Sequence, residues 1–226
     1  MLDKTKCDPN LGLAVHEHLV KCGVETPIDK NFLYADETEK ISKLQEYFTA
    51  IWKTMGLDLT DDSLAETPRR MAKMWVSETM WGLVPENFPK CTAVENKMHY
   101  DEMVIERNVN VQSQCEHHGV VISGFATVAY IPNQKVLGIS KINRLVEYFS
   151  KRPQIQERLT EQIYHALQYI LETDNIAVVI NAKHYCVISR GVEDVSSSTV
   201  TSKLGGCFKT DPAVRSEFMR MVSLRD

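Results

Sequence analysis

The chain has 226 residues, 43% hydrophobic and 25% charged, the ordinary balance of a globular protein. Its formal net charge of -4 gives no electrostatic drive for nonspecific nucleic-acid binding, although it leaves room for a local basic pocket that binds a small anion. The first residues lack the apolar core of a signal peptide, and no segment approaches the roughly 20 apolar residues of a membrane span, so we expect a cytoplasmic protein with neither nucleic-acid nor membrane partners.

Three helices are expected in the first third of the chain. Asp8 followed by Pro9 is an N-cap and first-turn signal, and the pattern predicts a short amphipathic helix over residues 8–23. A second helix is predicted over 36–56 from an apolar stripe with helical spacing, and a third over 67–82. The N-terminal region is therefore predicted to be helical.

The periodicity changes near residue 103, where β-branched residues become frequent. Strands are expected over 104–111 and 120–130, and we place a turn inside the second of these at Ser123 and Gly124. These strands flank the stretch QCEHHG, which begins at Gln114. We therefore expect this stretch to lie in or beside a sheet.

Two helices and two strands follow, and then a last helix. Helices are predicted over 140–151 and 155–170, with Pro153 breaking them apart. The runs NIAVVINAKHYCVISRG and SSSTVTSK predict strands, and a final helix is expected over 214–222. This order favours an α+β fold in which an antiparallel sheet is backed by the helix pair.

The cysteine pattern raises the question of a metal site. Cys115 and His118 are three residues apart, which lets a thiolate and an imidazole reach one ion, although such a pair is often incidental. Cys186 is the third candidate, and we place it on a predicted strand where His184 shares its face as a proton donor or acceptor. Three protein ligands leave an open position on zinc for water, which is typical of catalysis. The other four cysteines have no metal-binding neighbour and are interpreted as small apolar residues: Cys7, Cys22, Cys91 and Cys207.

Basic residues cluster at helical spacing and suggest anion binding, although solvated surface charges are the alternative for each pair taken alone. They are Arg70 and Lys73, Lys141 and Arg144, and Arg190. Gln156 and Glu157 lie in the first turn of a predicted helix, where a carboxylate complements the helix dipole. The alternative is that they bind the donor edge of a purine, because a carboxylate accepts two parallel N–H bonds.

Several motifs together resemble the GTP cyclohydrolase I family: CEHH, GISKINR, RPQIQERLT, HYCVISRG and STVTSKLGG, preceded by ETPRRMAKM and VENKM. They occur in the family's order, and the likeness covers nearly the whole chain. The resemblance implies a tunnelling fold assembled as a homodecamer with active sites at subunit interfaces. It also implies the reaction, in which GTP and water give 7,8-dihydroneopterin triphosphate and formate, the first step of folate and pterin biosynthesis. Residues 1–100 would form a helical region for assembly, and residues 101–226 the catalytic domain.

The resemblance also implies roles for individual residues. Zinc would be held by Cys115, His118 and Cys186, with His117 and His184 as acid-base groups and Ser140 active in the later sugar rearrangement. The guanine would be bound by Glu157 and its neighbour Gln156. The triphosphate contacts would be Lys141, Arg144, Arg190, Arg70 from across a subunit boundary and, less strongly, Lys73.

One departure from the family is Gly119, where a larger apolar residue is usual, and we expect it to loosen the loop that carries the ligands. Glu116 has no firm role. Two alternatives are weighed: an enzyme of the same fold acting on another pterin or deazapurine, and a noncatalytic oligomer that binds zinc and nucleotide. The first is disfavoured because every expected chemical position is present, and the second because a pure binder needs no proton donor at His184.

Overall fold

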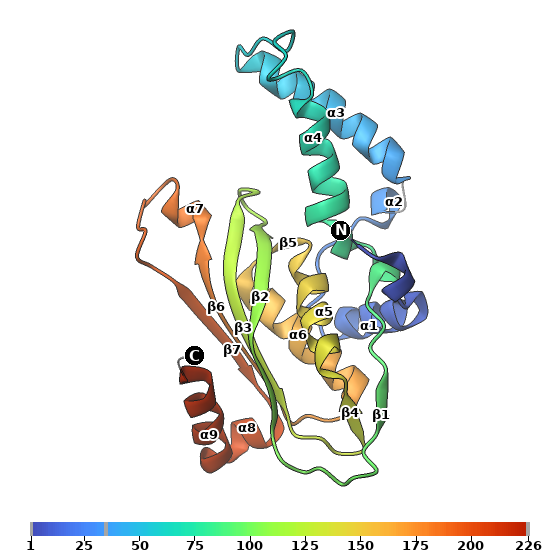
Figure 1. Ribbon diagram of the computed structural model, residues 1–226, viewed down its shortest axis with the longest axis vertical. Helices are drawn as coiled ribbons and strands as arrows, with labels where there is room; N and C mark the ends of the chain where they lie inside the picture. Colours follow the sequence, from blue (N-terminus) through green and yellow to red (C-terminus); the bar gives the residue numbers. More distant parts are fainter. Residues whose placement is uncertain (1, 34–35, 225–226) are drawn as a thin grey trace.

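A five-stranded sheet forms the centre of the protein in this computed structural model, which describes residues 2–33 and 36–224. The strand order is β5-β2-β3-β6-β7 (Figure 1). Four of these strands run antiparallel, and the short β5 pairs in parallel with the end of β2. The strands of this sheet are β2 (Val104–Cys115), β3 (Val121–Tyr130), β5 (Pro153–Gln154), β6 (Ile176–His184) and β7 (Thr199–Leu204).

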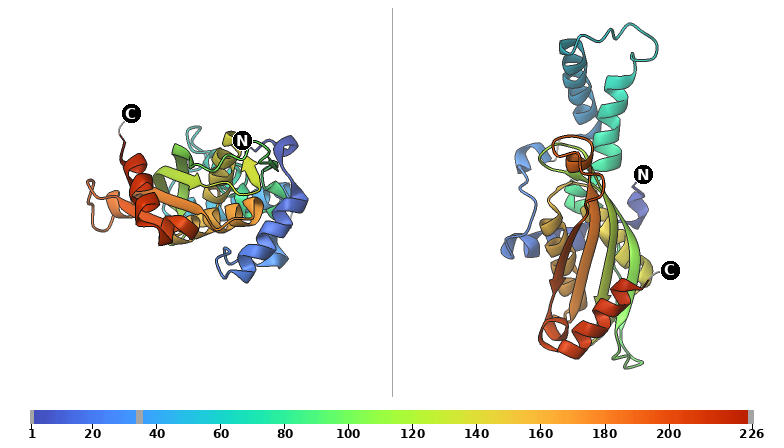
Figure 2. Two further views of the ribbon diagram at one scale, coloured as in Figure 1. Left: turned by 90° about the horizontal axis from the view of Figure 1, so that it is seen from below. Right: turned by 90° about the vertical axis from the view of Figure 1, so that its left-hand side faces the viewer.

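Two helices cover one face of the sheet, α5 (Ile139–Ser150) and α6 (Gln156–Leu171). Their apolar faces and the inward residues of the strands form one continuous core, which includes Leu145, Leu159 and Val178. The opposite face is partly covered by α8 (Gly206–Thr210) and α9 (Pro212–Ser223), as both views of Figure 2 show. The predicted α+β class and the sheet backed by a helix pair are confirmed.

The N-terminal region contains the expected helices. Helix α1 (Pro9–Lys21) begins after an Asp8 side chain that accepts the Leu11 N–H, and α3 (Glu37–Thr54) begins after a similar cap at Asp36. Helix α1 packs into the main core through Val15 and Leu19.

Helices α3 and α4 (Thr67–Lys73) form an arm that projects beyond one end of the sheet (Figure 1). Phe48 is the one buried residue of α3, whereas Ile51 and Met55 on its predicted apolar stripe are 52% and 72% exposed. The arm therefore presents apolar surface that this single chain does not cover. The remaining elements are short: α2 (Lys30–Leu33), α7 (Tyr185–Ile188), β1 (Ala93–Glu95), β4 (Lys135–Leu137), η1 (Lys4–Lys6), the π-helical η2 (Met74–Thr79), η3 (Trp81–Leu83) and η4 (Pro85–Asn87).

Two local predictions were wrong. Ser123 and Gly124 form no turn, because β3 runs without interruption through both and pairs with β2 and β6 on either side. A side chain at Gly124 would place its Cβ 2.1 Å from the Asn181 carbonyl oxygen, so this glycine permits close approach of two strands. Cys186 is not on a strand: β6 ends at His184, and Cys186 lies on the helical turn α7.

No helix within residues 2–33 and 36–224 is both long enough and apolar enough to cross a membrane.

Candidate active site and metal centre

The three predicted metal ligands converge at one end of the sheet. Cys115 is the last residue of β2, His118 lies in the turn between β2 and β3, and Cys186 follows the end of β6. One ligand atom from each lies within 4.8 Å of the other two. Because β6 pairs with β3 and places His184 beside Ile122, the register of the sheet brings the segment after β6 against the β2–β3 turn.

The β2–β3 turn is closed by backbone hydrogen bonds. The Gly119 N–H donates to the Cys115 carbonyl at 2.9 Å, and the Cys115 N–H donates to the Val120 carbonyl at 2.8 Å. Gly119 has a φ of 66°, a left-handed conformation that costs glycine little. This glycine therefore allows a tight turn that holds Cys115 and His118 together, where the sequence had suggested a looser loop.

His184 is held by a buried glutamine. Its Nε2 lies 2.8 Å from Gln156 Oε1, while the Gln156 amide nitrogen donates to the carbonyls of Ile180 and Thr199 and to the Thr201 hydroxyl. These three acceptors fix the amide orientation, so Oε1 must accept from an Nε2–H of His184. The remaining ring nitrogen, Nδ1, is left to exchange a proton. Gln156 is 1% exposed.

The electrostatics of the pocket favour a neutral imidazole and oppose a second free thiolate. Burial lowers the pKa of His184, and the nearby Glu157 carboxylate acts in the opposite direction. Burial raises the pKa of Cys186, and its interaction with Cys115 raises it further. Two adjacent thiolates repel each other unless a cation lies between them, so this pair suits a metal ion.

Glu116 contacts the helix that carries Gln156, a contact that the sequence had not suggested. Arg158 Nη1 donates to Glu116 Oε2 at 2.5 Å, and both side chains are largely shielded from solvent. The other carboxylate oxygen lies 3.9 Å from His117 Nε2. Glu116 thus links the β2–β3 turn to the start of α6. Because Glu116 and Arg158 are far apart in the sequence, no local pattern predicts this ion pair.

Two more predicted residues lie near these ligands. Arg190 Nη1 is 3.1 Å from His118 Nε2, and His117 Nδ1 is 3.9 Å from Cys115 Sγ. Glu157 is exposed in the first turn of α6, directly after Gln156.

The predicted residues of α5 are not brought to this pocket within one chain. Ser140, Lys141 and Arg144 lie near the start of α5, whereas the end of α5 at Ser150 leads to the strand that pairs with Cys115. Ten residues of helix separate Ser140 from that end, a length of about 15 Å. Arg70 and Lys73 are exposed on α4, in the projecting arm.

Comparison with known proteins identifies the family of this chain. Residues 44–223 match the family described as GTP cyclohydrolase I. The chain belongs to the GTP cyclohydrolase I family. It is 55% identical over 208 residues to the protein named GTP cyclohydrolase 1 of Yersinia enterocolitica, covering 92% of this chain and 94% of the relative. A relative of the same name from Erwinia tasmaniensis is 53% identical, and the match covers 93% of this chain and 96% of the relative. Another, from Shewanella amazonensis, is 54% identical, and the match covers 91% of this chain and 94% of the relative. The family resemblance drawn from the sequence motifs is thus confirmed, and with it the enzyme class.

Proposed function

We propose that this GTP cyclohydrolase is zinc-dependent, opens the guanine imidazole ring of GTP, releases formate and yields 7,8-dihydroneopterin triphosphate. The observation that carries the proposal is the convergence of Cys115, His118 and Cys186 beside a histidine whose orientation is fixed. Two thiols and an imidazole are the soft donors that zinc prefers, and three of them leave a coordination position open.

Zinc binding by His118 would change the hydrogen bonding of Arg190. His118 Nδ1 faces the Cys115 sulfur at 3.8 Å, while Nε2 faces the Arg190 guanidinium. Ligation through Nδ1 would leave the proton on Nε2, which could then not accept from Arg190. The guanidinium would then be available to bind an anion such as the triphosphate of GTP. Zinc held by this trio would lower the pKa of a water molecule to about 7 and so supply hydroxide for addition at C8 of guanine.

His184 is proposed to move the proton that ring opening requires. Gln156 Oε1 holds its Nε2–H, so Nδ1 is the atom that gives a proton to N7 of guanine and takes one back. Glu157, one residue from Gln156, is proposed to accept the N–H groups of the guanine edge and to orient C8. Gln156 remains predicted as a guanine contact, although all of its polar atoms are already bonded within the chain.

The complete site is proposed to form between subunits of a homodecamer. The separation of Ser140, Lys141 and Arg144 from the cysteine ligands supports a contribution from a neighbouring copy. Arg70 and Lys73 are exposed on the arm, so a neighbouring copy can reach them. Residues 1–100 would then serve mainly assembly, and residues 101–226 catalysis. Ser140 and His117 would act in the rearrangement of the ribose, and the product would enter folate or pterin biosynthesis in the cytoplasm.

Incubation with GTP tests the proposal. Zinc-loaded protein should release formate and give a product that becomes fluorescent after oxidation, as pterins do. Zinc-loaded, correctly assembled protein that binds GTP without forming either product would instead support a noncatalytic binding role.

A further inference from the structure

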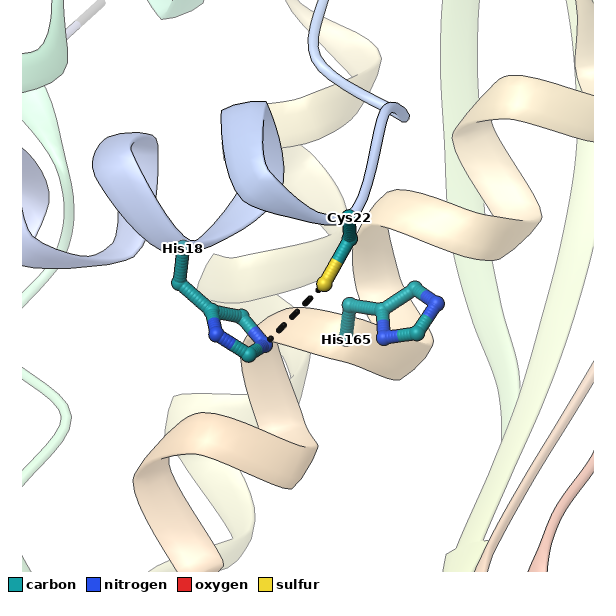
Figure 3. Close-up of side chains that lie close together, drawn as sticks. All are labelled: His18, Cys22 and His165. Atoms are coloured by element: carbon teal, nitrogen blue, oxygen red, sulfur yellow. Dashed lines mark hydrogen bonds between the residues drawn. The ribbon is translucent and has the colours of Figure 1, made fainter.

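Side chains that can bind metal converge in a second place within residues 2–33 and 36–224, away from the cysteines of the catalytic site. His18 and Cys22 lie at the end of α1, and His165 lies in the middle of α6 (Figure 3). One ligand atom from each is within 4.8 Å of the other two. We propose that His18, Cys22 and His165 form a second metal site, which holds a thiophilic divalent cation such as Zn²⁺ and links α1 to α6.

The two helices present these groups for clear reasons. His18 and Cys22 are four residues apart, so their side chains lie on the same face of α1, near its C-terminal end. The neighbouring turns of α1 bury Val15 and Leu19 in the core that α6 shares, which holds this end of α1 against α6. His18 and Cys22 form an HxxxC pair, which places a metal-binding side chain beside Cys22. The interpretation of Cys22 as a cysteine without a metal-binding neighbour was therefore wrong.

The separation of the Cys22 sulfur and the His18 nitrogen suits a tetrahedral ion. With bonds of about 2.3 Å to sulfur and about 2.0–2.1 Å to nitrogen, two ligands at a tetrahedral angle lie about 3.6 Å apart. Cys22 Sγ and His18 Nε2 are 3.6 Å apart. The rings of His18 and His165 meet edge to face with centroids 6.1 Å apart, so the second imidazole stands beside this pair.

The surroundings of His165 resemble the outer shell of a metal site. Its Nε2 lies 3.4 Å from Glu161 Oε2, and Lys203 holds that carboxylate at 2.9 Å. A carboxylate that accepts one ring N–H directs the other nitrogen toward a metal. In Figure 3 the other nitrogen, Nδ1, is on the side of Cys22. Gln168 Oε1 now lies 2.9 Å from Nδ1, and an ion would replace this hydrogen bond.

Such an ion would have a structural effect rather than a direct role in the chemistry. Helix α6 begins with Gln156 and Glu157 of the proposed active site, and His165 lies on the same helix. A metal bond from α1 to His165 would fix α1 on the helix that carries these residues. Because ions that bind only the folded chain stabilise it, metal removal should lower the melting temperature.

Metal content per chain tests the site directly. After loading with Zn²⁺ and removal of the excess, wild type should hold two equivalents and Cys22→Ser one, with formate release from GTP retained. Cys207→Ser is the matched control, because Cys207 is also half-buried and belongs to neither cluster, and it should retain both equivalents. Cys186→Ser should lose the other equivalent. Equal metal content in wild type and Cys22→Ser would overturn the proposal.

Cobalt provides a second measurement that does not depend on stoichiometry. In the Cys186→Ser background, added Co²⁺ should produce a near-ultraviolet thiolate-to-metal band that disappears on introducing Cys22→Ser and weakens with His165→Gln. Zn²⁺ should also raise the melting temperature of Cys186→Ser, and this rise should vanish when Cys22→Ser is added. A cobalt band and a thermal shift that both survive Cys22→Ser would contradict the assignment.

Discussion

Replacement of Gln156 by methionine separates two roles for this residue. Methionine keeps a similar length and apolar volume but removes the amide that holds His184. It also removes the donors to the Ile180 and Thr199 carbonyls and to the Thr201 hydroxyl. If Gln156 acts by positioning His184, the loss should fall on the chemical step. If it binds guanine, the loss should fall on the binding of GTP.

The expected sizes follow from these contacts. One hydrogen bond contributes about 0.5–1.5 kcal/mol, up to roughly a factor of ten, and misplacing a catalytic group adds to this. We therefore expect kcat to fall about 10- to 100-fold while KM for GTP stays within about twofold. The buried Ile180 carbonyl loses a donor, and the more exposed Thr199 carbonyl loses one that water can replace, so the free energy of unfolding should fall by about 1–3 kcal/mol.

Gln162 offers a matched control. It is equally buried on the same helix, donates to the carbonyl of Val24 and the hydroxyl of Thr26, and accepts from Gln154. Gln162→Met should cost similar stability in urea unfolding yet leave kcat near wild type, with both variants assayed well below their melting temperatures. A raised KM with unchanged kcat in Gln156→Met would refute the positioning role, as would an equal loss of kcat in Gln162→Met.

Three further changes have defined outcomes. His184→Ala should keep metal content near wild type and abolish formate release, and loss of metal would show that His184 is a ligand. Arg152→Met should lower the free energy of unfolding in urea by about 3–5 kcal/mol, because it leaves the buried Glu25 carboxylate without its cation partner; a change below about 1 kcal/mol would mean that other donors suffice. Gly124→Ala should destabilise the protein, because its Cβ would overlap the Asn181 carbonyl, and an unchanged melting temperature would disprove the close-approach explanation.

Features with local causes were predictable from the sequence. Asp8 and Asp36 cap α1 and α3 where the pattern placed them, and Pro153 separates α5 from α6. A cap requires only a side-chain oxygen close to the next backbone N–H groups, so a few adjacent residues suffice to predict it.

Features with distant causes were not predictable in this way. Gly124 looked like a turn because the Asn181 carbonyl that requires a glycine there lies far along the chain. Cys186 was predicted to lie on a strand but lies on the helical turn α7. It still lies beside Cys115 and His118, because the pairing of β3 with β6 brings the segment after β6 to the β2–β3 turn. The hydrogen bond between Gln156 and His184 depends on the packing of α6 against β6 and β7. The periodicity of a sequence predicts single elements and not which elements pack together.

The most direct test of metal-dependent catalysis measures zinc content and formate release from GTP on the same samples. Chelator-stripped wild type should release no formate and should recover when zinc is returned. Cys186→Ser should show no recovery because its catalytic ligand set is incomplete, whereas Cys207→Ser should behave as wild type. Formate release by stripped wild type, or by Cys186→Ser at the wild-type rate, would contradict a catalytic zinc held by Cys115, His118 and Cys186.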